Sequence, residues 1–461
     1  MKVVLVNPPR SEPEKLAKKV HPPLNLLYLA TALDRAGIAV EVLDANAADL
    51  TIAQIADRLR VMAPGLIGFP LFSDIIAPTY RLVELTRAAL PQTKIVLGGI
   101  HVSADPPGTA AIFTDADFFL AGYAENSLTL LAQTLRDGGD LDHIPRLTYR
   151  IAGQIVTTPD ADDEFDIDAV PIPDRRFVRE HYERGAYYQI MNTRTLDSIV
   201  TSRGCKFACR FCYNAIRRGV AHRSAENIYE EIVQRYEAGM RFLDIDDDNF
   251  TQERERMGQI FAWIRRDKLD LKLFLKSRSD ALDRATLSQA KAAGTEIISF
   301  GIESGVQHIL DAMRKGTKVE RNAEMIEKAK RAGIMVHAGF LLGYPGETPE
   351  TIAATIRFIN RTKPDAVSLQ VLKPYPGTAV YEQAEAEGTL VGSWDPRKPG
   401  LPWVRLPWTQ SRDDLEAWAK IFARRVYLRP YYAWRIPQQI VKNANRRMAR
   451  YALQNLRGLI K

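Results

Sequence analysis

Cysteine is scarce in this sequence. Its 461 residues include only three cysteines, and all three lie within eight positions, at Cys205, Cys209 and Cys212. An odd number without partners elsewhere argues against a disulfide framework. Three thiols so close together in a reducing compartment indicate a metal site.

Long apolar runs are also absent. No stretch approaches the roughly 18 to 20 uninterrupted apolar residues that span a bilayer. The N-terminal segment from Met1 to Pro9 lacks the apolar length and the small-residue cleavage site of a secretory signal. The composition, with 46% hydrophobic and 26% charged residues, is that of a globular protein with more than one core. We therefore expect a cytoplasmic protein.

Acidic residues are missing from the end of the chain. Between Lys420 and Lys461 there are eleven Lys or Arg and no Asp or Glu, which leaves residues 1–419 with a net charge of −4 out of the total of +7. The acidic body argues against nucleic-acid binding. The basic, aromatic-rich tail over 420–461 fits either a peripheral membrane contact or a helix packed on the protein with a solvated basic face.

The first 135 residues alternate short buried strands with helical patterns. This order predicts a doubly wound parallel sheet, of Rossmann or flavodoxin type, over residues 1–136, with its ligand at the carboxyl ends of the strands. The expected strands are Val3–Val6, Val40–Leu43, Leu66–Phe69, Ile95–Leu97 and Phe118–Leu120, and the expected helices lie near 24–36, 52–62, 77–90 and 125–135.

A second strand–helix series predicts a partial (β/α)6 TIM-type barrel over residues 195–375, with its chemistry at the C-terminal strand ends. Its expected strands are Ser198–Thr201, Phe242–Ile245, Lys272–Leu275, Ile297–Phe300, Met335–Leu341 and Val367–Val371. Residues 137–194 between the two series are expected to be a solvated linker with a small hairpin near Leu147–Val156. Residues 376–461 should form a helical C-terminal region, with one helix beginning at the capping box of Ser411 and Asp414. The chain is thus predicted to be an α/β protein.

The cysteines follow the first strand of the second series. Spacings of four and three residues wrap a loop around one [4Fe–4S] cluster, so that three irons each receive a thiolate. Because there is no fourth cysteine, the fourth iron is left for a non-protein ligand. The alternatives are three buried thiols or a zinc site, although structural zinc usually takes four protein ligands.

The Cys-x-x-x-Cys-x-x-Cys motif, with the aromatic Phe211 before its last cysteine, resembles the radical S-adenosylmethionine (SAM) superfamily. The resemblance implies that the amino and carboxylate groups of SAM bind the open iron. One electron from the cluster, supplied by an external donor of flavodoxin or ferredoxin type, then cleaves SAM to a 5′-deoxyadenosyl radical that abstracts hydrogen from the substrate.

The same resemblance implies SAM contacts at the strand ends. Glu303 resembles the family glutamate that contacts SAM, although it could merely cap a helix. An Asp-rich segment replaces the family's Gly-Gly-Glu after the second strand, so one of its carboxylates is expected to hold the SAM amine. The implied SAM-contacting residues are Glu303, Ser277, Arg278, Asp247, Asp248 and Tyr344.

The N-terminal region is similar to the cobalamin-binding domain that precedes the barrel in a large radical SAM subclass. The motifs that carry this similarity are Asn7-Pro8-Pro9, His21–Leu24, Leu97–His101 and Ala121–Glu125. The Asp-x-His-x-x-Gly signature of other B12 proteins is missing, as it is in the radical SAM members. The implied cobalamin contacts are Phe72, Ser73, Gly98, Gly99, His101, Gly122 and Glu125. The alternative is a flavodoxin-like domain that no longer binds cobalamin.

The combined pattern resembles the group of the anaerobic magnesium-protoporphyrin ester cyclase and the class B radical SAM methyltransferases. The resemblance implies methylation of an unactivated carbon through methylcobalamin. Two alternatives remain: a non-methylating radical reaction, such as ring formation, oxidation or rearrangement, and a cobalamin- or cluster-binding sensor without turnover. The substrate is expected to be a small or lipid-like molecule, and no nucleic acid is expected as a partner.

Overall fold

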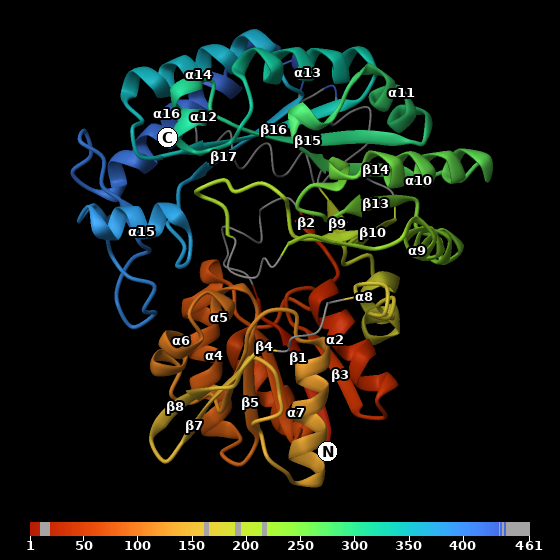
Figure 1. Cartoon of the computed structure of the whole chain (residues 1–461), viewed down its shortest axis with the longest axis vertical. Helices are drawn as coiled ribbons and strands as arrows, with labels where there is room; N and C mark the ends of the chain where they lie inside the picture. Colours follow the sequence, from red (N-terminus) through yellow and green to blue (C-terminus); the bar gives the residue numbers. More distant parts are fainter. Residues whose placement is uncertain are drawn as a thin grey trace.

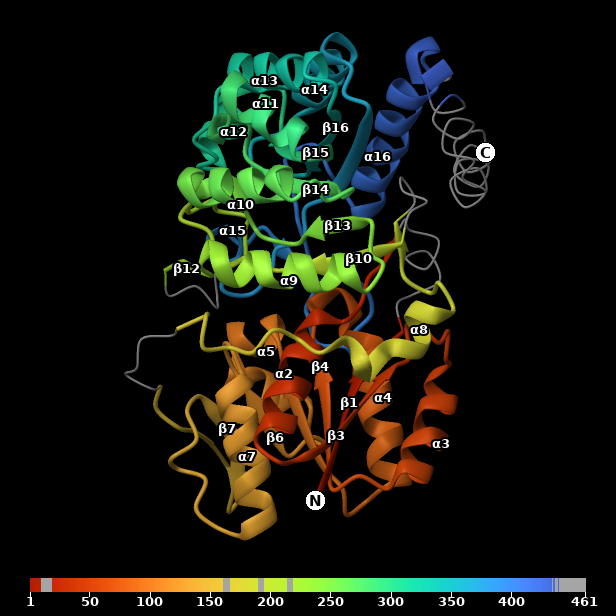
Figure 2. The same cartoon turned by 90° about the vertical axis from the view of Figure 1, so that its right-hand side faces the viewer.

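The computed structural model describes residues 1–9, 19–160, 166–189, 195–213, 219–432, 434, 435 and 438. These residues form two mainly parallel sheets that lie one above the other, each with its own helices (Figure 1). The carboxyl ends of the first sheet face the second sheet (Figure 2). The predicted α/β architecture is therefore confirmed.

The first sheet has seven strands in the order β3-β1-β4-β5-β6-β7-β8. Its strands are β1 (Lys2–Asn7), β3 (Ala39–Asp44), β4 (Leu66–Pro70), β5 (Lys94–Gly98), β6 (Phe118–Leu120), β7 (Leu147–Ile151) and β8 (Gln154–Thr157). Its helices are α2 (Leu24–Arg35), α3 (Ile52–Met62), α4 (Ile76–Ala89), α5 (Ile100–Ala104), α6 (Pro106–Ile112) and α7 (Glu125–Asp137), with a 3-10 turn η1 at Ser73–Ile75.

Both faces of this sheet are covered, as a doubly wound fold requires. Val3 and Leu5 of β1 pack with α2 and α7, whereas Val4 and Val6 pack on the other face with α3 and α4. Burial on both faces explains why these strands are continuous apolar runs. The predicted strands and the four predicted helices are found where the sequence placed them.

Helices α5 and α6 had no counterpart in the sequence prediction. The segment Asp105-Pro106-Pro107-Gly108 has the composition of a loop, yet the Asp105 carboxylate accepts a hydrogen bond from the amide of Gly108 and caps α6. Proline is tolerated in the first helical turn because its missing N–H would have no helical partner there.

The hairpin near Leu147–Val156 is present but belongs to the first sheet. Strand β7 pairs antiparallel with β6, and β8 pairs with β7. The sheet therefore continues well past residue 136, and the expected linker begins only after Thr157. The apolar side of β7, with Leu147 and Tyr149 buried, is what makes this hairpin part of a core rather than of a solvated connector.

The second sheet is open and has six parallel strands in the order β10-β13-β14-β15-β16-β17. Its strands are β10 (Leu196–Ile199), β13 (Phe242–Ile245), β14 (Lys272–Ser277), β15 (Thr295–Glu303), β16 (Met335–Leu342) and β17 (Ala366–Val371). Its helices are α9 (Ala225–Glu237), α10 (Arg254–Arg266), α11 (Arg284–Ala292), α12 (Gln307–Ala312), α13 (Val319–Arg331) and α14 (Pro349–Thr362), with 3-10 turns η3 (Phe250–Gln252) and η4 (Ser279–Ala281). The partial barrel is confirmed, with no closure between its edge strands among the described residues.

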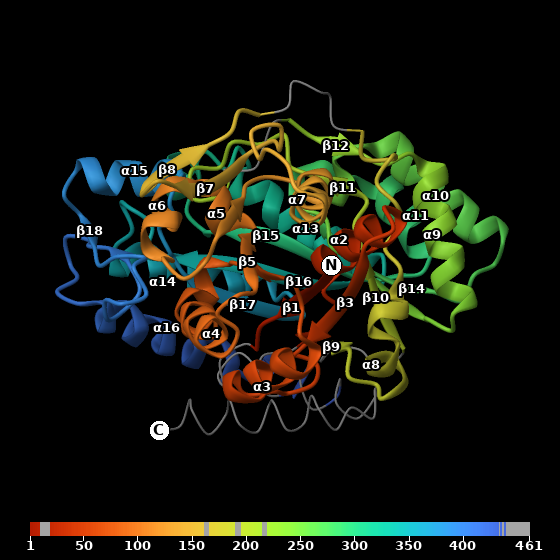
Figure 3. The ribbon, with the colours of Figure 1, turned by 90° about the horizontal axis from the view of Figure 1, so that it is seen from below.

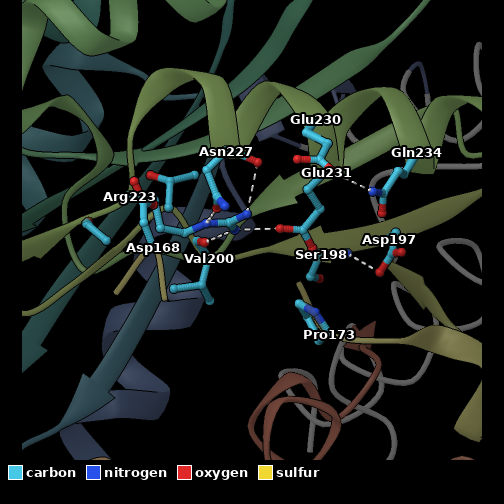
Figure 4. A network of polar contacts seen from close by, with 12 residues as sticks. Asp168, Pro173, Asp197, Ser198, Val200, Arg223, Asn227, Glu230, Glu231 and Gln234 are labelled. Carbon is cyan, nitrogen blue, oxygen red and sulfur yellow. Dashed lines mark hydrogen bonds and ion pairs between the residues drawn. The ribbon is translucent and has the colours of Figure 1, made fainter. Parts of the chain in front are cut away.

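The connector between the sheets carries the turn η2 (Arg175–Val178), the helix α8 (Arg179–Glu183) and the short strand β9 (Tyr188–Gln189), which pairs with β2 (Lys19–Val20). Its Arg175 is buried and lies 2.7 Å from Glu231 of α9 and 3.3 Å from Asp197 of β10. Arg223 joins the same Glu231 at 2.5 Å and also donates to Asn227 (Figure 4). This part of the expected solvated connector is therefore a buried ionic joint.

The C-terminal region contains α15 (Ala379–Ala386), the strand pair β18 (Leu390–Val391) and β19 (Trp403–Val404), and α16 (Arg412–Tyr427). Residues 379–404 lie on the side of the molecule that carries α5 and α6 (Figure 3), and Trp394 packs in the core of the first domain. The predicted capping box at Ser411 is present.

Helix α16 and Tyr432 pack on the second sheet, and Arg435 pairs with Asp365 at 2.8 Å. The described start of the basic tail is thus packed on the protein, while residues 439–461 lie outside the described part. Among the described residues, no helix has both the length and the apolar character that crossing a membrane requires.

Candidate functional site

The cysteine loop leaves β10 and passes through a short strand, β11 (Ser202–Arg203), which pairs antiparallel with β12 (Ala221–His222). Gly204 follows with φ +88°, and a Cβ there would lie 2.6 Å from the carbonyl oxygen of Gly219. Glycine is therefore required at the entry to Cys205. The side-chain amide of Gln252, in η3, donates a hydrogen bond to the Gly204 carbonyl at 3.3 Å and steadies this turn.

Asp247, after β13, is buried and holds the start of the loop. It accepts hydrogen bonds from the amide and hydroxyl of Thr201 and from the hydroxyl of Ser202, at 2.7 Å for the last. Burial raises the pKa of Asp247, and these hydrogen bonds lower it part of the way. Asp247 thus supports the loop, and of the two expected carboxylates only Asp248 is exposed. Contact of either with SAM stays a prediction.

Arg278 lies against the cysteine loop. Its guanidinium is 3.6 Å from the centre of the Phe207 ring, and its Nη1 is 4.0 Å from the Sγ atom of Cys209. Asp280 holds the guanidinium from the other side at 2.8 Å. Burial raises the pKa of the Cys209 thiol, while the positive charges of Lys315 and Arg278 favour the thiolate that binds iron.

Glu303 ends β15 in a left-handed conformation, with φ +64°, at a register shift between β15 and β16. Such a backbone is costly for a residue with a side chain and is typical of functional sites. Its Oε1 lies 2.9 Å from Nζ of Lys315, and both side chains are largely buried, at 14% and 8% exposure. A Cβ at Gly301 would lie 2.5 Å from the same Oε1, so glycine leaves room for this pair.

Lys315 was not predicted from the sequence. It follows α12, twelve positions after Glu303, in a turn that no local pattern distinguishes from an ordinary helix end. Burial alone would lower the pKa of Lys315, but the charges of Glu303 and Cys209 outweigh it and raise the pKa. The site therefore holds a lysine that stays charged between the cysteine loop and Glu303.

The remaining expected SAM contacts are anchored by other groups. The Ser277 hydroxyl lies 2.7 Å from that of Thr251 and donates to the Arg278 carbonyl. Tyr344 is 1% exposed and donates to the carbonyl of Ala312. Both residues lie at strand ends near the loop, as expected, and their contact with SAM stays a prediction.

The inner face of the second sheet is polar just below Glu303. Lys276 pairs with Asp246, which directly follows the neighbouring strand β13, and the Ser299 hydroxyl lies 2.8 Å from Nδ1 of His337. Lys276, Ser299 and His337 stand side by side on β14, β15 and β16. All four residues are partly or fully exposed, while the residues that alternate with them are buried under the helices. A molecule entering the sheet would meet hydrogen-bonding groups here.

In the first domain, the turn after β4 and helix α5 bring two neutral polar side chains together. Ser73 and His101 are buried and lie 2.8 Å apart, from Oγ to Nδ1, and His101 also packs edge-on against Trp394. Burial lowers the pKa of His101 to about 4. Phe72 beside them is exposed at 41%. The structure thus brings Phe72, Ser73 and His101 together at the edge facing the cysteine loop.

Gly99 and Gly122 have internal reasons to be glycine, whereas a Cβ at Gly98, the third expected glycine, would make only an ordinary contact, 3.6 Å from the Leu120 carbonyl oxygen. A Cβ at Gly99 would lie 3.1 Å from the Leu71 carbonyl oxygen, and one at Gly122 would lie 2.0 Å from Nη1 of Arg146. These internal contacts alone explain why Gly99 and Gly122 are glycines, without a bound macrocycle. Their contact with cobalamin stays a prediction.

Glu125, the last expected cobalamin contact, is paired with Arg203 of the cysteine loop at 2.5 Å. Its other oxygen, Oε2, is buried without a hydrogen-bond partner in the described part of the chain. A buried carboxylate oxygen needs a donor, and the amide side chains of a corrin are such donors. This edge of the first domain therefore fits cobalamin.

Among the described residues no group of three or more His, Cys, Asp or Glu converges on one metal position. A cubane does not require convergence, because each of its irons takes one thiolate.

Comparison with known proteins agrees with both halves of the chain. The radical SAM superfamily matches residues 199–359, and the B12 binding domain matches residues 16–132. An uncharacterized methyltransferase of Pyrococcus horikoshii is 29% identical over 85% of this chain and 84% of its own. The anaerobic magnesium-protoporphyrin IX monomethyl ester cyclase of Synechocystis is 24% identical over 100% of this chain and 92% of its own. Among solved structures, the radical SAM methyltransferase TsrM of Kitasatospora setae superposes with a TM-score of 0.72 at 20% identity, covering 92% of this chain and 81% of that one.

The chain therefore contains a radical SAM superfamily domain over residues 199–359 and a B12-binding domain over residues 16–132. Its cofactors are SAM, a [4Fe–4S] cluster and cobalamin.

Proposed function

We propose that this chain is a cobalamin-dependent radical SAM enzyme that transfers a methyl group to an unactivated carbon. The observation that carries the proposal is the buried Glu303–Lys315 pair beside the cysteine loop. The methionine part of SAM bears one amino group and one carboxylate, and this pair offers a hydrogen-bond acceptor to the first and a cation to the second. A buried ion pair is costly unless it is fully satisfied, and these two groups of SAM bound against it would supply further partners.

Each part of the chain has a role in this function. Cys205, Cys209 and Cys212 would hold the cluster, and Asp247 and Gln252 keep their loop in place. Glu303 would accept a hydrogen bond from the amino group of SAM, and Lys315 would donate one to its carboxylate. The bound cofactors supply a 5′-deoxyadenosyl radical from SAM and a methyl carrier in cobalamin. The protein supplies orientation and a site closed to water.

Methylation is supported by two relatives that are named methyltransferases. One is similar to this chain in sequence and the other in structure. The cyclase of Synechocystis, which matches this chain along its full length, supports a second candidate, a radical reaction without methyl transfer. The two functions differ in co-product, because only a methyltransferase converts SAM to S-adenosylhomocysteine.

The inner face of the second sheet supports a substrate with polar groups near the reacting carbon. A purely apolar lipid would desolvate the Lys276–Asp246 and Ser299–His337 pairs without giving them new hydrogen bonds, which costs binding free energy. An external one-electron donor of flavodoxin or ferredoxin type is part of the proposal, because three cysteines bind only one cluster. Membrane contact through residues 420–461 stays a prediction.

The test is anaerobic reconstitution with iron, sulfide and hydroxocobalamin, followed by incubation with SAM and a strong reductant. We expect S-adenosylhomocysteine to form only when cobalamin is present. Formation of 5′-deoxyadenosine with no S-adenosylhomocysteine at any cobalamin loading would favour the non-methylating candidate.

A further inference from the structure

The cysteine loop is tied to the first domain at the residue two positions before its first cysteine. Arg203 Nη2 lies 2.5 Å from Oε1 of Glu125, which opens α7 at a strand end of the first sheet. The two side chains are 10% and 12% exposed. A nearly buried ion pair of this kind couples its partners far more strongly than a surface pair does.

Two tyrosines of the first domain enclose the same guanidinium. Its carbon lies 5.0 Å from the ring centre of Tyr28 and 4.6 Å from that of Tyr123. Cation–π contacts with a largely buried arginine are attractive, and these two rings restrict where the guanidinium can lie. Arg203 is therefore held on three sides by the first domain.

On the first-domain side, hydrogen bonds connect this contact to the residues that are expected to contact the corrin. The Gly122 amide donates to the Ser103 hydroxyl at 2.9 Å, and that hydroxyl donates to the Gly99 carbonyl at 2.9 Å. The turn that carries Tyr123 and Glu125 is thus fixed to the end of β5.

The barrel side is equally rigid. Arg203 pairs with Ala221 in the β11–β12 ribbon, and Ser202 before it is bound by Asp247. Gly204 after it admits no side chain. A shift of Arg203 would therefore move the backbone that leads into Cys205.

We propose that Arg203 is a positioning residue that latches the cluster loop to the cobalamin edge through Glu125 and so sets the distance between the two cofactors. The latch rests on the proposed function, since it needs both cofactors in one molecule. Glu125 would serve both sides, with Oε1 on Arg203 and the otherwise unpartnered Oε2 on a corrin amide. Methyl transfer depends on the relative placement of two cofactors, whereas SAM cleavage depends on the cluster side alone.

The experiment compares Glu125→Gln with Asp117→Asn in the full-length reconstituted protein. Asp117 forms an ion pair with Arg87 inside the first domain, so its substitution is a matched loss of charge away from the cysteine loop. Arg203→Lys, which keeps the charge but not the planar guanidinium, is the second variant if Glu125→Gln is insoluble. Iron, sulfide and cobalamin contents are measured first, followed by the distance distribution between cob(II)alamin and the reduced cluster by pulsed EPR.

For Glu125→Gln we expect cluster content and 5′-deoxyadenosine formation within about twofold of the unchanged protein, since the cysteines are untouched. We expect a broadened cofactor distance distribution and at least a tenfold lower yield of S-adenosylhomocysteine. Asp117→Asn should match the unchanged protein in every measurement. A distance distribution unchanged in both Glu125→Gln and Arg203→Lys would overturn the latch, as would parallel losses of both SAM products. If the unchanged protein forms no SAM products, the proposed function fails, while the EPR distances still decide the latch.

Discussion

The two sheets present different chemistry at the edges that face each other. The strand ends of the second sheet carry buried charges, with Arg278 and Lys315 near Cys209 and Glu303 paired to the lysine. Those of the first sheet bring together a neutral histidine, a serine and aromatic rings, while charged groups there are paired with other segments, Glu125 with Arg203 and Asp74 with Lys373. Charged groups suit an anionic cluster and a zwitterionic ligand, whereas neutral groups suit a large macrocycle bound by many weak contacts.

A second difference lies in how each edge is held in place. The cluster side is braced by hydrogen bonds from its own domain, above all through Asp247. The cobalamin side is covered by residues from elsewhere in the chain, because Trp394 packs on His101 and stacks on Tyr375. Tyr375 in turn lies 5.3 Å from the ring of Tyr213, which follows Cys212. The two ends of the cysteine loop are thus both linked to the first domain. Arg203 contacts Glu125 directly, and Tyr213 is linked through Tyr375 and Trp394.

The largest expected effect is on the cluster side. Cys209→Ser should remove one of three cluster ligands and lower 5′-deoxyadenosine formation by at least about a thousandfold, since catalysis requires the electron from the cluster. Iron and sulfide analysis and product chromatography measure this. Cobalamin binding should be unchanged, because the first domain is intact, and joint loss of both cofactors would show that the two edges are not independent.

The second-largest expected effect is at the buried ionic joint between the two sheets, which Arg175 forms with Asp197 and Glu231. Arg175→Met should destabilise the protein by about 3 kcal/mol, because the buried carboxylates of Asp197 and Glu231 would each lose one cation and keep only Arg235, at 3.8 Å, and Arg223. Urea unfolding measures this free energy. Arg266→Met removes an exposed pair with Asp267 and should cost at most about 1 kcal/mol. Equal effects of the two substitutions would contradict the account of the joint.

The two edges should respond to pH with opposite sign. Burial raises the pKa of Glu347, after β16, to about 7, so the folded state holds a proton that the unfolded chain releases above its ordinary value of 4.5. Stability from this group therefore falls as pH rises from about 4.5 to 7, by about 3 kcal/mol. His101 has a lowered pKa of about 4, so stability falls as pH drops from 6.5 towards 4.

Urea unfolding at pH 5 and pH 7.5 separates these contributions when each variant is compared with the unchanged protein. Glu347→Gln should flatten the loss of stability on raising the pH, and His101→Gln should flatten the loss on lowering it. If the dependence of the unfolding free energy on pH changed in the same direction in both variants, this difference between the edges would be refuted.

The smallest effect distinguishes two carboxylates of the cluster side. Glu303→Gln should weaken SAM binding about tenfold, the value of one charge-assisted hydrogen bond, with the cluster content unchanged. Asp247→Asn should instead lower the cluster content, while the protein molecules that hold a cluster should bind SAM with normal affinity. Calorimetric titration of cluster-loaded protein with SAM gives both values. A normal SAM affinity in Glu303→Gln would remove Glu303 from the SAM site.

Much of this arrangement could be predicted from the sequence, because buried parallel strands are apolar runs of fixed length and a cysteine motif is local. The strands, most helices and the placing of Glu303 and Arg278 near the cysteines follow from such patterns. Lys315, Arg203 and Trp394 could not be predicted, since their roles depend on contacts between segments far apart in the chain. Composition alone places the hairpin of β7 and β8 in a linker, because composition does not show which sheet a strand joins.

The most direct measurement is the product of SAM cleavage in the anaerobically reconstituted, reduced protein. The account predicts 5′-deoxyadenosine in the protein with a full [4Fe–4S] complement and none in Cys209→Ser. Absence of 5′-deoxyadenosine from protein with an intact, reducible cluster and bound SAM would contradict the central claim that the cysteine loop, Glu303 and Lys315 form a site for radical SAM chemistry.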